Sequence, residues 1–229
     1  ANAGKQIGTG MQHEDDITDI AFSPDGKIVA TAGRDKVARI WHATSGAFTG
    51  KSMMHPDEIV WARFCPSGQR LVTATADYKV RMWDIATGKC IGPAWQNSTR
   101  VSALAVSADD HFALTGGIDG MIHVWDAQTG VAAGPPLWHE GRVCSIAVSP
   151  SGRRLVTGGW DYLAKVWDFN ERRPIGPAIR HMARVAAVSF DSDDDMVATW
   201  CHDGRVRIWR LAPPVEGSVE TISLSIERA

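Results

Sequence analysis

Five copies of a 42-residue unit follow one another along this chain without an insertion or a deletion. A tryptophan, an aspartate and a threonine each recur at this step in all five copies. The three series are Trp41, Trp83, Trp125, Trp167 and Trp209; Asp35, Asp77, Asp119, Asp161 and Asp203; and Thr31, Thr73, Thr115, Thr157 and Thr199. A period between 20 and 50 residues indicates a repeat protein in which each copy forms one supersecondary unit.

Each period has the pattern of short β-strands separated by turns. In the fourth copy the apolar runs SIAVS, RLVTGG and LAKVWD are separated by the turn signals SPSG and WDY, and helical periodicity is absent. A hairpin folded about position 162 places Thr157 and Trp167 opposite each other on neighbouring strands, unless a bulge shifts the pairing by one residue. Four strands of roughly 6 residues fit into one period, which predicts one propeller blade per copy.

Composition excludes several classes of partner. The chain has 229 residues, 44% of them hydrophobic, which is enough for a large buried core. Its formal net charge of −2 does not indicate nucleic-acid binding, and no apolar run approaches the length of a membrane span. The four cysteines have no CxxC spacing, which favours reduced thiols. We therefore expect a cytoplasmic protein with no nucleic-acid and no membrane partner.

Two short motifs relate the repeats to a known family. FSPDG follows the first strand at residues 22–26, and the third strand ends in Trp-Asp in the second, third and fourth copies. In these features the chain resembles the WD40 repeat family from about Gly4 to Trp209. The resemblance implies an all-β fold, a β-propeller of WD40 repeats with five four-stranded blades in this chain. Residues 1–211 are expected to form the propeller, as part of a longer array, and residues 212–229 a C-terminal tail that leaves it.

The resemblance also implies a hydrogen-bonded structural tetrad in each blade, formed in the fourth copy by His139, Thr157, Asp161 and Trp167. Indole, hydroxyl, imidazole and carboxylate can form a continuous donor-to-acceptor chain, so all four can be buried with partners. The threonine, histidine and aspartate also have the types of a nucleophile, a base and an orienting acid. An enzyme needs one such site and this set recurs in four copies, so we expect no catalytic residues.

The third copy departs from this pattern. Its histidine is replaced by Asn97, whereas the other copies have His13, His55, His139 and His181. Losing one buried partner typically costs about 1–3 kcal/mol unless water or the amide replaces it. The remaining histidines have no metal-binding spacing, and the chain lacks a nucleotide-binding glycine pattern. We therefore expect no metal and no cofactor.

The two ends of the chain raise the question of ring closure. The segment from Gln6 to Met11 matches the later fourth strands in register, which predicts that it supplies the outermost strand of the blade containing Trp209. Whether five blades close into one ring or belong to a larger or multi-chain propeller is open. The segment from Val219 to Ile226 fits both a strand and a helix. The IGPA strands resemble those of multidomain bacterial WD40 proteins with an upstream kinase or signalling ATPase, although no such catalytic motif is present.

The expected function is that of a non-catalytic scaffold that mediates protein–protein interaction, in bacterial signalling. Rigid blades would present their loops to a protein or peptide partner, since the polar groups of the repeat are used internally. One alternative is a structural array that self-assembles through unpaired blade edges. Another alternative is an enzyme built on a propeller.

One set of loop residues is the candidate partner-binding surface. The residue just before each first strand is Asp16, Glu58, Arg100, Arg142 or Arg184, at the 42-residue step. These five residues are expected to surround one face, where the three arginines suit a carboxylate- or phosphate-bearing partner. Trp160 and His202 occupy a variable position before the turn aspartate and resemble contact residues of the family on that face. The alternative is that the arginines form salt bridges with neighbouring loops and that Trp160 packs against its own blade.

Overall fold

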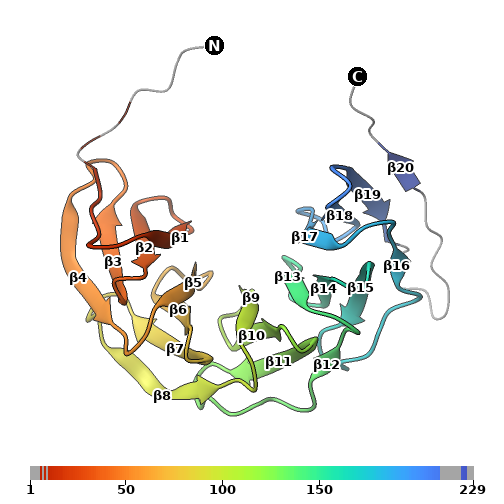
Figure 1. Ribbon diagram of the computed structural model, residues 1–229, viewed down its shortest axis with the longest axis horizontal. Helices are drawn as coiled ribbons and strands as arrows, with labels where there is room; N and C mark the ends of the chain where they lie inside the picture. The colour runs from red at the N-terminus through yellow and green to blue at the C-terminus, as the bar shows by residue number, and fades with distance from the viewer. Residues whose placement is uncertain (1–5, 7, 9, 212–222, 226–229) are drawn as a thin grey trace. The chain divides into compact units, whose positions relative to one another are not determined.

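The computed structural model describes residues 6, 8, 10–211 and 223–225, and all the regular secondary structure in this part of the chain is β-strand. The strands form five antiparallel sheets of four, and sequential strands are neighbours in every sheet (Figure 1). The prediction of an all-β fold with five four-stranded blades is therefore confirmed. By its internal contacts the chain divides into two compact units, Ala1–Gln96 with Ala127–Gly130, and Asn97–Asp126 with Val131–Ala229.

The first unit contains two sheets, each corresponding to one copy of the repeat. The first sheet consists of β1 (Ile17–Phe22), β2 (Ile28–Gly33), β3 (Val37–His42) and β4 (Phe48–Met54). The second sheet consists of β5 (Ile59–Phe64), β6 (Arg70–Thr75), β7 (Lys79–Asp84) and β8 (Cys90–Gln96).

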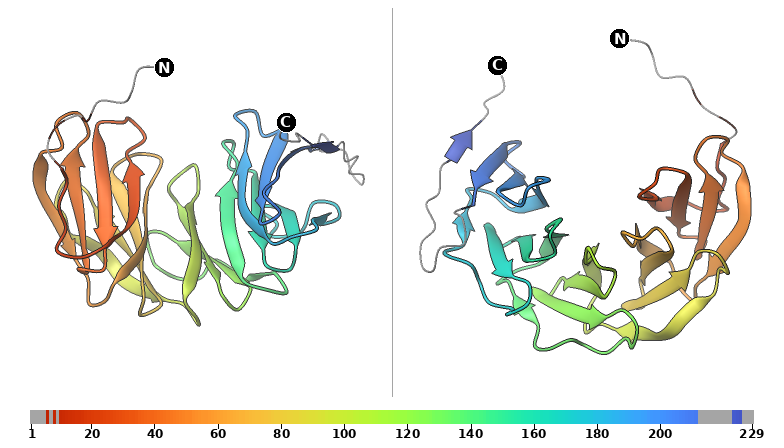
Figure 2. Two further views of the ribbon diagram at one scale, coloured as in Figure 1. Left: turned by 45° about the horizontal axis from the view of Figure 1, so that its top comes forward. Right: turned by 180° about the vertical axis from the view of Figure 1, so that it is seen from behind.

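The second unit contains three sheets. The third sheet consists of β9 (Val101–Val106), β10 (Phe112–Gly117), β11 (Met121–Asp126) and β12 (Leu137–Trp138). The fourth consists of β13 (Val143–Val148), β14 (Arg154–Gly159), β15 (Leu163–Asp168) and β16 (Ile179–Arg180). The fifth consists of β17 (Val185–Phe190), β18 (Met196–Cys201), β19 (Val206–Arg210) and β20 (Ser223–Ser225). Figure 2 shows the sheets of both units from two further directions.

The β14–β15 hairpin is centred one residue earlier than the sequence predicts. Thr157 pairs with Lys165 and Leu155 pairs with Trp167, without a bulge, so the hairpin folds about Asp161. The reason lies in the turn, where Tyr162 has a φ of 63° and Asp161 accepts a hydrogen bond of 3.2 Å from the Leu163 amide. Thr157 and Trp167 are therefore diagonal rather than direct neighbours, a spacing that a large aromatic side chain still spans.

The outermost strands differ in length between copies. β4 and β8 each have seven residues, whereas β12 and β16 each have two. Pro135 and Pro136 directly precede β12, and Pro177 lies two residues before β16. Proline does not explain the difference by itself, because Pro93, at the repeat position of Pro135 and Pro177, lies inside the seven-residue β8. Beyond β12 and β16 the outer ladder continues only as single bridges, such as that between Trp167 and Pro174.

The fifth sheet corrects the prediction that the N-terminal segment supplies its outermost strand. That position next to β19 is occupied by β20, in which Leu224 pairs with Ile208. A strand edge can pair with only one neighbour, so the segment from Gln6 to Met11 cannot also occupy it. Residues 6, 8, 10 and 11 of that segment are not in a strand, and 7 and 9 lie outside the described residues. Within the segment from 219 to 226, whose conformation the sequence left open, 223–225 form a strand.

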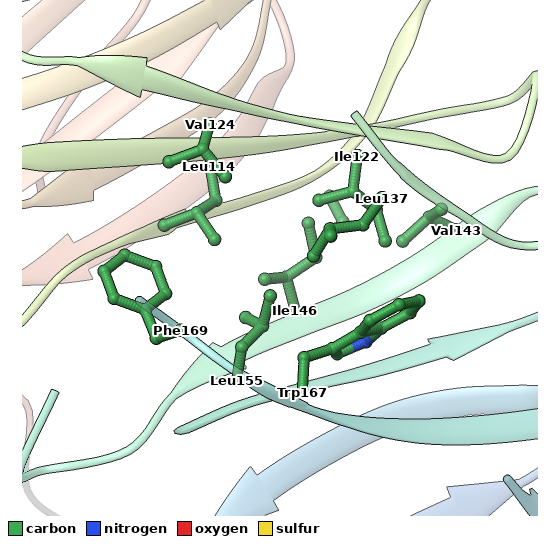
Figure 3. Close-up of a cluster of buried hydrophobic side chains, with 10 residues drawn as sticks. Leu114, Ile122, Val124, Leu137, Val143, Ile146, Leu155, Trp167 and Phe169 are labelled. Carbon is green, nitrogen blue, oxygen red and sulfur yellow. The ribbon is translucent and has the colours of Figure 1, made fainter. Parts of the chain in front are cut away.

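Apolar side chains fill the space between consecutive sheets within each unit. In the second unit, Leu114 and Ile122 of the third sheet pack with Ile146, Leu155 and Trp167 of the fourth (Figure 3). In the first unit an equivalent cluster contains Ala30, Ala32, Ile40, Met53, Ile59 and Leu71. Within each unit, consecutive sheets thus pack face to face, as expected for stacked repeats.

Hydrogen bonds between neighbouring sheets recur at the same repeat position. The Thr18 hydroxyl donates to the Ile59 carbonyl oxygen at 2.5 Å in the first unit. The Ser102 hydroxyl donates to the Val143 carbonyl oxygen at 2.6 Å in the second unit. These bonds hold the loops that lead into the first strands at defined positions, and those loops carry the candidate site.

Candidate functional site

The predicted tetrad of the fourth sheet is joined by hydrogen bonds in the structure. The Trp167 indole N–H donates to the Thr157 hydroxyl oxygen at 2.9 Å, and that hydroxyl lies 2.7 Å from Nε2 of His139. His139 Nδ1 lies 2.8 Å from Oδ2 of Asp161. The Asp161 pKa is lowered, because the hydrogen bond and charge of His139 outweigh the opposite effect of burial. The chain of bonds connects the loop before β13 to the β14–β15 hairpin.

The first sheet has the same arrangement with an added arginine. His13 Nε2 lies 2.6 Å from the Thr31 hydroxyl, and His13 Nδ1 lies 3.0 Å from Oδ2 of Asp35. Arg39 on β3 also donates to Asp35. Burial by itself would raise the pKa of Asp35, but the hydrogen bonds from Arg39 and His13 dominate and lower it to about 2.

In the second sheet the histidine does not reach the turn aspartate. His55 Nδ1 lies 2.9 Å from the Met53 carbonyl oxygen, and His55 Nε2 lies 2.8 Å from the Thr73 hydroxyl. Arg81 donates to Asp77 instead, at 3.4 Å. Burial disfavours the charged imidazole and lowers the pKa of His55 to about 4.

The fifth sheet has the most open arrangement. Both ring nitrogens of His181 are buried, and neither has a hydrogen-bond partner within the part of the chain that the structure describes. Asp203 is bound instead by Arg207, at 2.6 Å. The His181 ring packs edge-on against Trp209, with centroids 5.4 Å apart. Burial, together with the charge of Arg207, lowers the pKa of His181 to about 4.

In the third sheet the hydrogen bonds that histidine makes in other sheets are made by two side chains, those of Asn97 and Ser98. The Thr115 hydroxyl donates to Oδ1 of Asn97 at 2.6 Å, and Trp125 donates to Thr115 at 2.9 Å. The Ser98 hydroxyl donates to Oδ2 of Asp119 at 2.8 Å. The amide therefore provides the replacement that the sequence left as an alternative, and the serine supplies a partner for the aspartate.

These groups are sealed from solvent. Thr157 and His139 are fully buried, and the side chain of Asp161 is almost fully buried. A substrate cannot approach the Thr157 hydroxyl, which already has two hydrogen-bond partners. The arrangement therefore acts structurally, by satisfying polar groups that connect three parts of each repeat.

The acidic members of the predicted surface lie in the first unit and are paired with one arginine. Arg34 donates to Oδ2 of Asp16 at 3.1 Å, and Nε of Arg34 lies 3.9 Å from Oε2 of Glu58. Arg34 comes from the variable position before the turn aspartate, and all three side chains are exposed. Exposed pairs of this kind contribute little stability, about 0–1 kcal/mol, but they partly neutralise the two carboxylates.

The basic members lie in the second unit, and two of them contact Trp160. The Arg184 guanidinium lies over the indole at 3.9 Å from the ring centroid, and that of Arg142 lies at 5.5 Å. Neither arginine forms a salt bridge within the described residues. Trp160 retains 39% of its surface exposed, and its backbone N–H donates to the Arg142 carbonyl oxygen at 2.9 Å. The structure thus brings together an exposed indole and two unneutralised guanidinium groups.

The remaining candidates are at the edge of this cluster. The His202 backbone N–H donates to the Arg184 carbonyl oxygen at 3.0 Å, so His202 is held beside the same loop. Arg100 is exposed and has no ion pair or ring contact among the described residues. Sequence reasoning missed Met182, two residues before Arg184 in the same loop, which is 93% exposed. Its signal is an apolar, flexible side chain at a position that in other copies is Glu14, Pro56, Ser98 or Glu140.

The described residues contain no group of three or more His, Cys, Asp or Glu side chains arranged to hold a metal ion. No helix in this part of the chain is long and apolar enough to cross a bilayer. The four cysteines form no disulfide. A groove in the first unit, at the opposite end of the sheets, is lined by the turn residues 23–25, 27, 28 and 66–69 and by His42.

Comparison with known proteins agrees with this repeat structure. A sequence model of the family described as WD domain, G-beta repeat (WD40) matches five segments that together cover more than half of the chain. They are residues 4–42, 50–84, 88–126, 137–168 and 178–210. No curated protein sequence matches the chain. The five matched segments correspond to the five copies of the 42-residue unit.

Proposed function

This chain belongs to the WD40 repeat family, and on that premise we propose that it is a non-catalytic scaffold that binds a protein or peptide partner. WD40 repeats support a protein-interaction function in general. For this chain we propose a specific binding surface, formed by the loops that lead into the first strands of the second unit, around Trp160.

The observation that carries the proposal is the contact between Arg184 and Trp160. An arginine stacked on an indole is held in position by that contact, so less conformational freedom is lost when it binds. Arg142 adds a second positive charge whose Nε is buried without a hydrogen-bond partner in the described residues. Tryptophan and arginine are also the residues most often found as interface hot spots. This combination favours a partner that presents carboxylate or phosphate groups next to an apolar side chain.

The acidic residues of the predicted surface, Asp16 and Glu58, are less suited to binding a cationic partner than the arginines are to binding an anionic one. Asp16 and Glu58 already have Arg34 beside them, whereas Arg142 and Arg184 form no salt bridge with any described residue. We therefore assign the partner to the basic cluster. Asp16 and Glu58 then serve to order the loops of their own unit.

The wider setting is part of the same proposal. The resemblance of the repeats to those of multidomain bacterial WD40 proteins supports a role in bacterial signalling, in the cytoplasm. A structural array that self-assembles is the second candidate, because β4 and β8 offer seven-residue outer strands. Molar mass in solution distinguishes the two, since a scaffold keeps the mass of one chain over a range of concentrations.

Peptide binding tests the site directly. Peptides that carry glutamate or phosphoserine beside a leucine would be compared with glutamine and serine versions of the same sequence. We expect Trp160→Ala and Arg142→Ala each to weaken binding of the charged peptides by more than about 1 kcal/mol. Arg153→Ala is the matched control, because Arg153 is exposed at the opposite end of the same sheet. Equal binding by wild type and by both site variants would exclude this surface.

A further inference from the structure

One repeat position carries a small residue in four sheets and a tryptophan in the fifth. It lies on the second strand of each sheet and is occupied by Ala32, Ala74, Gly116, Gly158 and Trp200. The backbone at this position is equivalent throughout. Gly158 pairs with Ala164 on the next strand, and Trp200 pairs with Val206 at the corresponding place.

The position is small because it faces the next sheet. A Cβ atom added at Gly158 would lie 2.6 Å from Cγ1 of Val185 and 3.0 Å from Cγ1 of Val188. At Gly116 the same addition would lie 2.6 Å from Cγ1 of Val143. Real Cβ contacts are not this short, so at Gly116 and Gly158 the first strand of the following sheet leaves no room even for a methyl group.

Trp200 therefore cannot occupy a sheet face that is covered in this way. Its side chain is 49% exposed, and Val206 beside it is 50% exposed. Within the second unit no sheet packs on this face of β18 and β19, the last full-length strands of that unit. Both strands are labelled in Figure 1. The fifth sheet therefore has the same strand pairing as the sheets that stack, but the Trp200 side chain fills the space that the next sheet would occupy.

The strand that would stack on such a face is present in the same chain. Ile17 and Ile20 of β1 are the repeat equivalents of Val185 and Val188, which are buried. In β1 these side chains are exposed, and Ile20 is 58% exposed. A second copy of the chain therefore offers an apolar first strand in the register that the other sheets accept.

We propose that Trp200 is a stop residue that prevents the first strand of a second copy from stacking on the fifth sheet. With glycine or alanine at this position, the two apolar surfaces are complementary, and head-to-tail stacking of copies would produce an open, growing assembly. The indole fills the space that Ile17 and Ile20 of the second copy need. Steric exclusion of a competing partner is a recognised means of specificity. This inference goes beyond the proposed binding surface, because it concerns the faces of the sheets and not their loops.

The test uses two full-length chains that can associate in one way only. The acceptor chain carries Ile20→Asp, which disables its own first strand, together with Trp200→Gly. The donor chain is the wild type, which keeps Ile20 and whose own fifth sheet is blocked by Trp200. Neither chain can then close on itself or bind a second copy of itself through this interface. The control acceptor carries Ile20→Asp alone, and sedimentation velocity measures complex formation in each mixture.

We expect the acceptor with Trp200→Gly to bind the wild-type chain at least about tenfold more tightly than the control acceptor does. A second acceptor, with Ile20→Asp and Trp200→Ala, guards against a folding defect caused by glycine, because alanine is the native residue in the first two sheets. Circular dichroism and thermal unfolding establish that each acceptor is folded. The proposal is overturned if the control acceptor binds as tightly as the others, or if neither folded acceptor that lacks Trp200 binds the wild-type chain.

Discussion

Nδ1 of His139 lies 2.8 Å from Oδ2 of Asp161, whereas the equivalent His181 in the fifth sheet makes no such bond. The two sheets also differ in the third strand. Arg207 binds Asp203 in the fifth sheet, while Lys165 at the equivalent position donates to the Trp138 carbonyl oxygen at 2.8 Å. Arginine at this position does not by itself displace the histidine, because in the first sheet Arg39 and His13 both bind Asp35.

Removal of the two aspartates should therefore have unequal effects. Asp161→Ala should lower the free energy of unfolding by about 1–3 kcal/mol, because it leaves His139 buried without its partner. Asp203→Ala is the matched control and should cost less, since its arginine partner is near the surface and can be hydrated. Denaturant unfolding of both variants checks the order, and equal effects would contradict the buried hydrogen-bond chain in the fourth sheet.

Histidine at position 97 should change stability only slightly. Asn97 already accepts a hydrogen bond from the Thr115 hydroxyl, and the Ser98 hydroxyl already donates one to Asp119. Asn97→His would restore the usual residue, but Thr115 and Asp119 already have hydrogen-bond partners. The free energy of unfolding should therefore remain the same or increase by less than about 1 kcal/mol. A loss of several kcal/mol in thermal or denaturant unfolding would show that the third sheet is built around the amide.

Stability should fall in mild acid because of two buried histidines. The pKa values of His55 and His181 are lowered from 6.5 to about 4 in the folded state, chiefly by burial. The unfolded chain then binds more protons between these values, so this contribution to stability is complete above about pH 6.5 and is lost as the pH falls toward about 4. Each histidine could contribute up to roughly 3 kcal/mol over that window.

The histidine contribution can be separated from that of the carboxylates by substitution. His55→Asn keeps an acceptor for the Thr73 hydroxyl, as Asn97 does for Thr115. The double variant with His181→Asn should show a flatter dependence of unfolding free energy on pH between 6.5 and 4 than the wild type. An unchanged slope in urea unfolding measured across this range would mean that neither histidine is held neutral by the fold.

Substitution to alanine at the repeat position of Trp200 should have different effects on stability in the fourth and fifth sheets. Gly158→Ala places a methyl group against Val185 and Val188, which are anchored in β17, and should destabilise the chain by about 1–3 kcal/mol. Trp200→Ala, at the same repeat position, should change the unfolding free energy by less than about 1 kcal/mol because the side chain is half exposed. Thermal unfolding of the two variants gives the comparison, and a neutral Gly158→Ala would remove the steric argument for this position.

The repeat, the strand class and the identity of the tetrad residues can all be predicted from the sequence. An uninterrupted step of 42 residues indicates one structural unit per copy. Short apolar runs separated by turn signals predict that each unit is built from strands. The pairing register was predicted one residue late. That register depends on the left-handed conformation of Tyr162, which residues other than glycine rarely adopt. The same conformation recurs at this repeat position in Lys36, Tyr78, Gly120 and Gly204.

Which polar groups have partners, and which apolar residues remain exposed, depends on how the strands and sheets pack in three dimensions. His55, His139 and His181 are indistinguishable in the repeat pattern, yet only His139 bonds to its turn aspartate. In the other two sheets the aspartate is bound by an arginine of β7 or β19. Trp200 appears in the sequence as one more apolar residue in a strand. Its meaning depends on the distance from Gly158 to Val185, and such a distance between sheets is set by packing that no local pattern encodes.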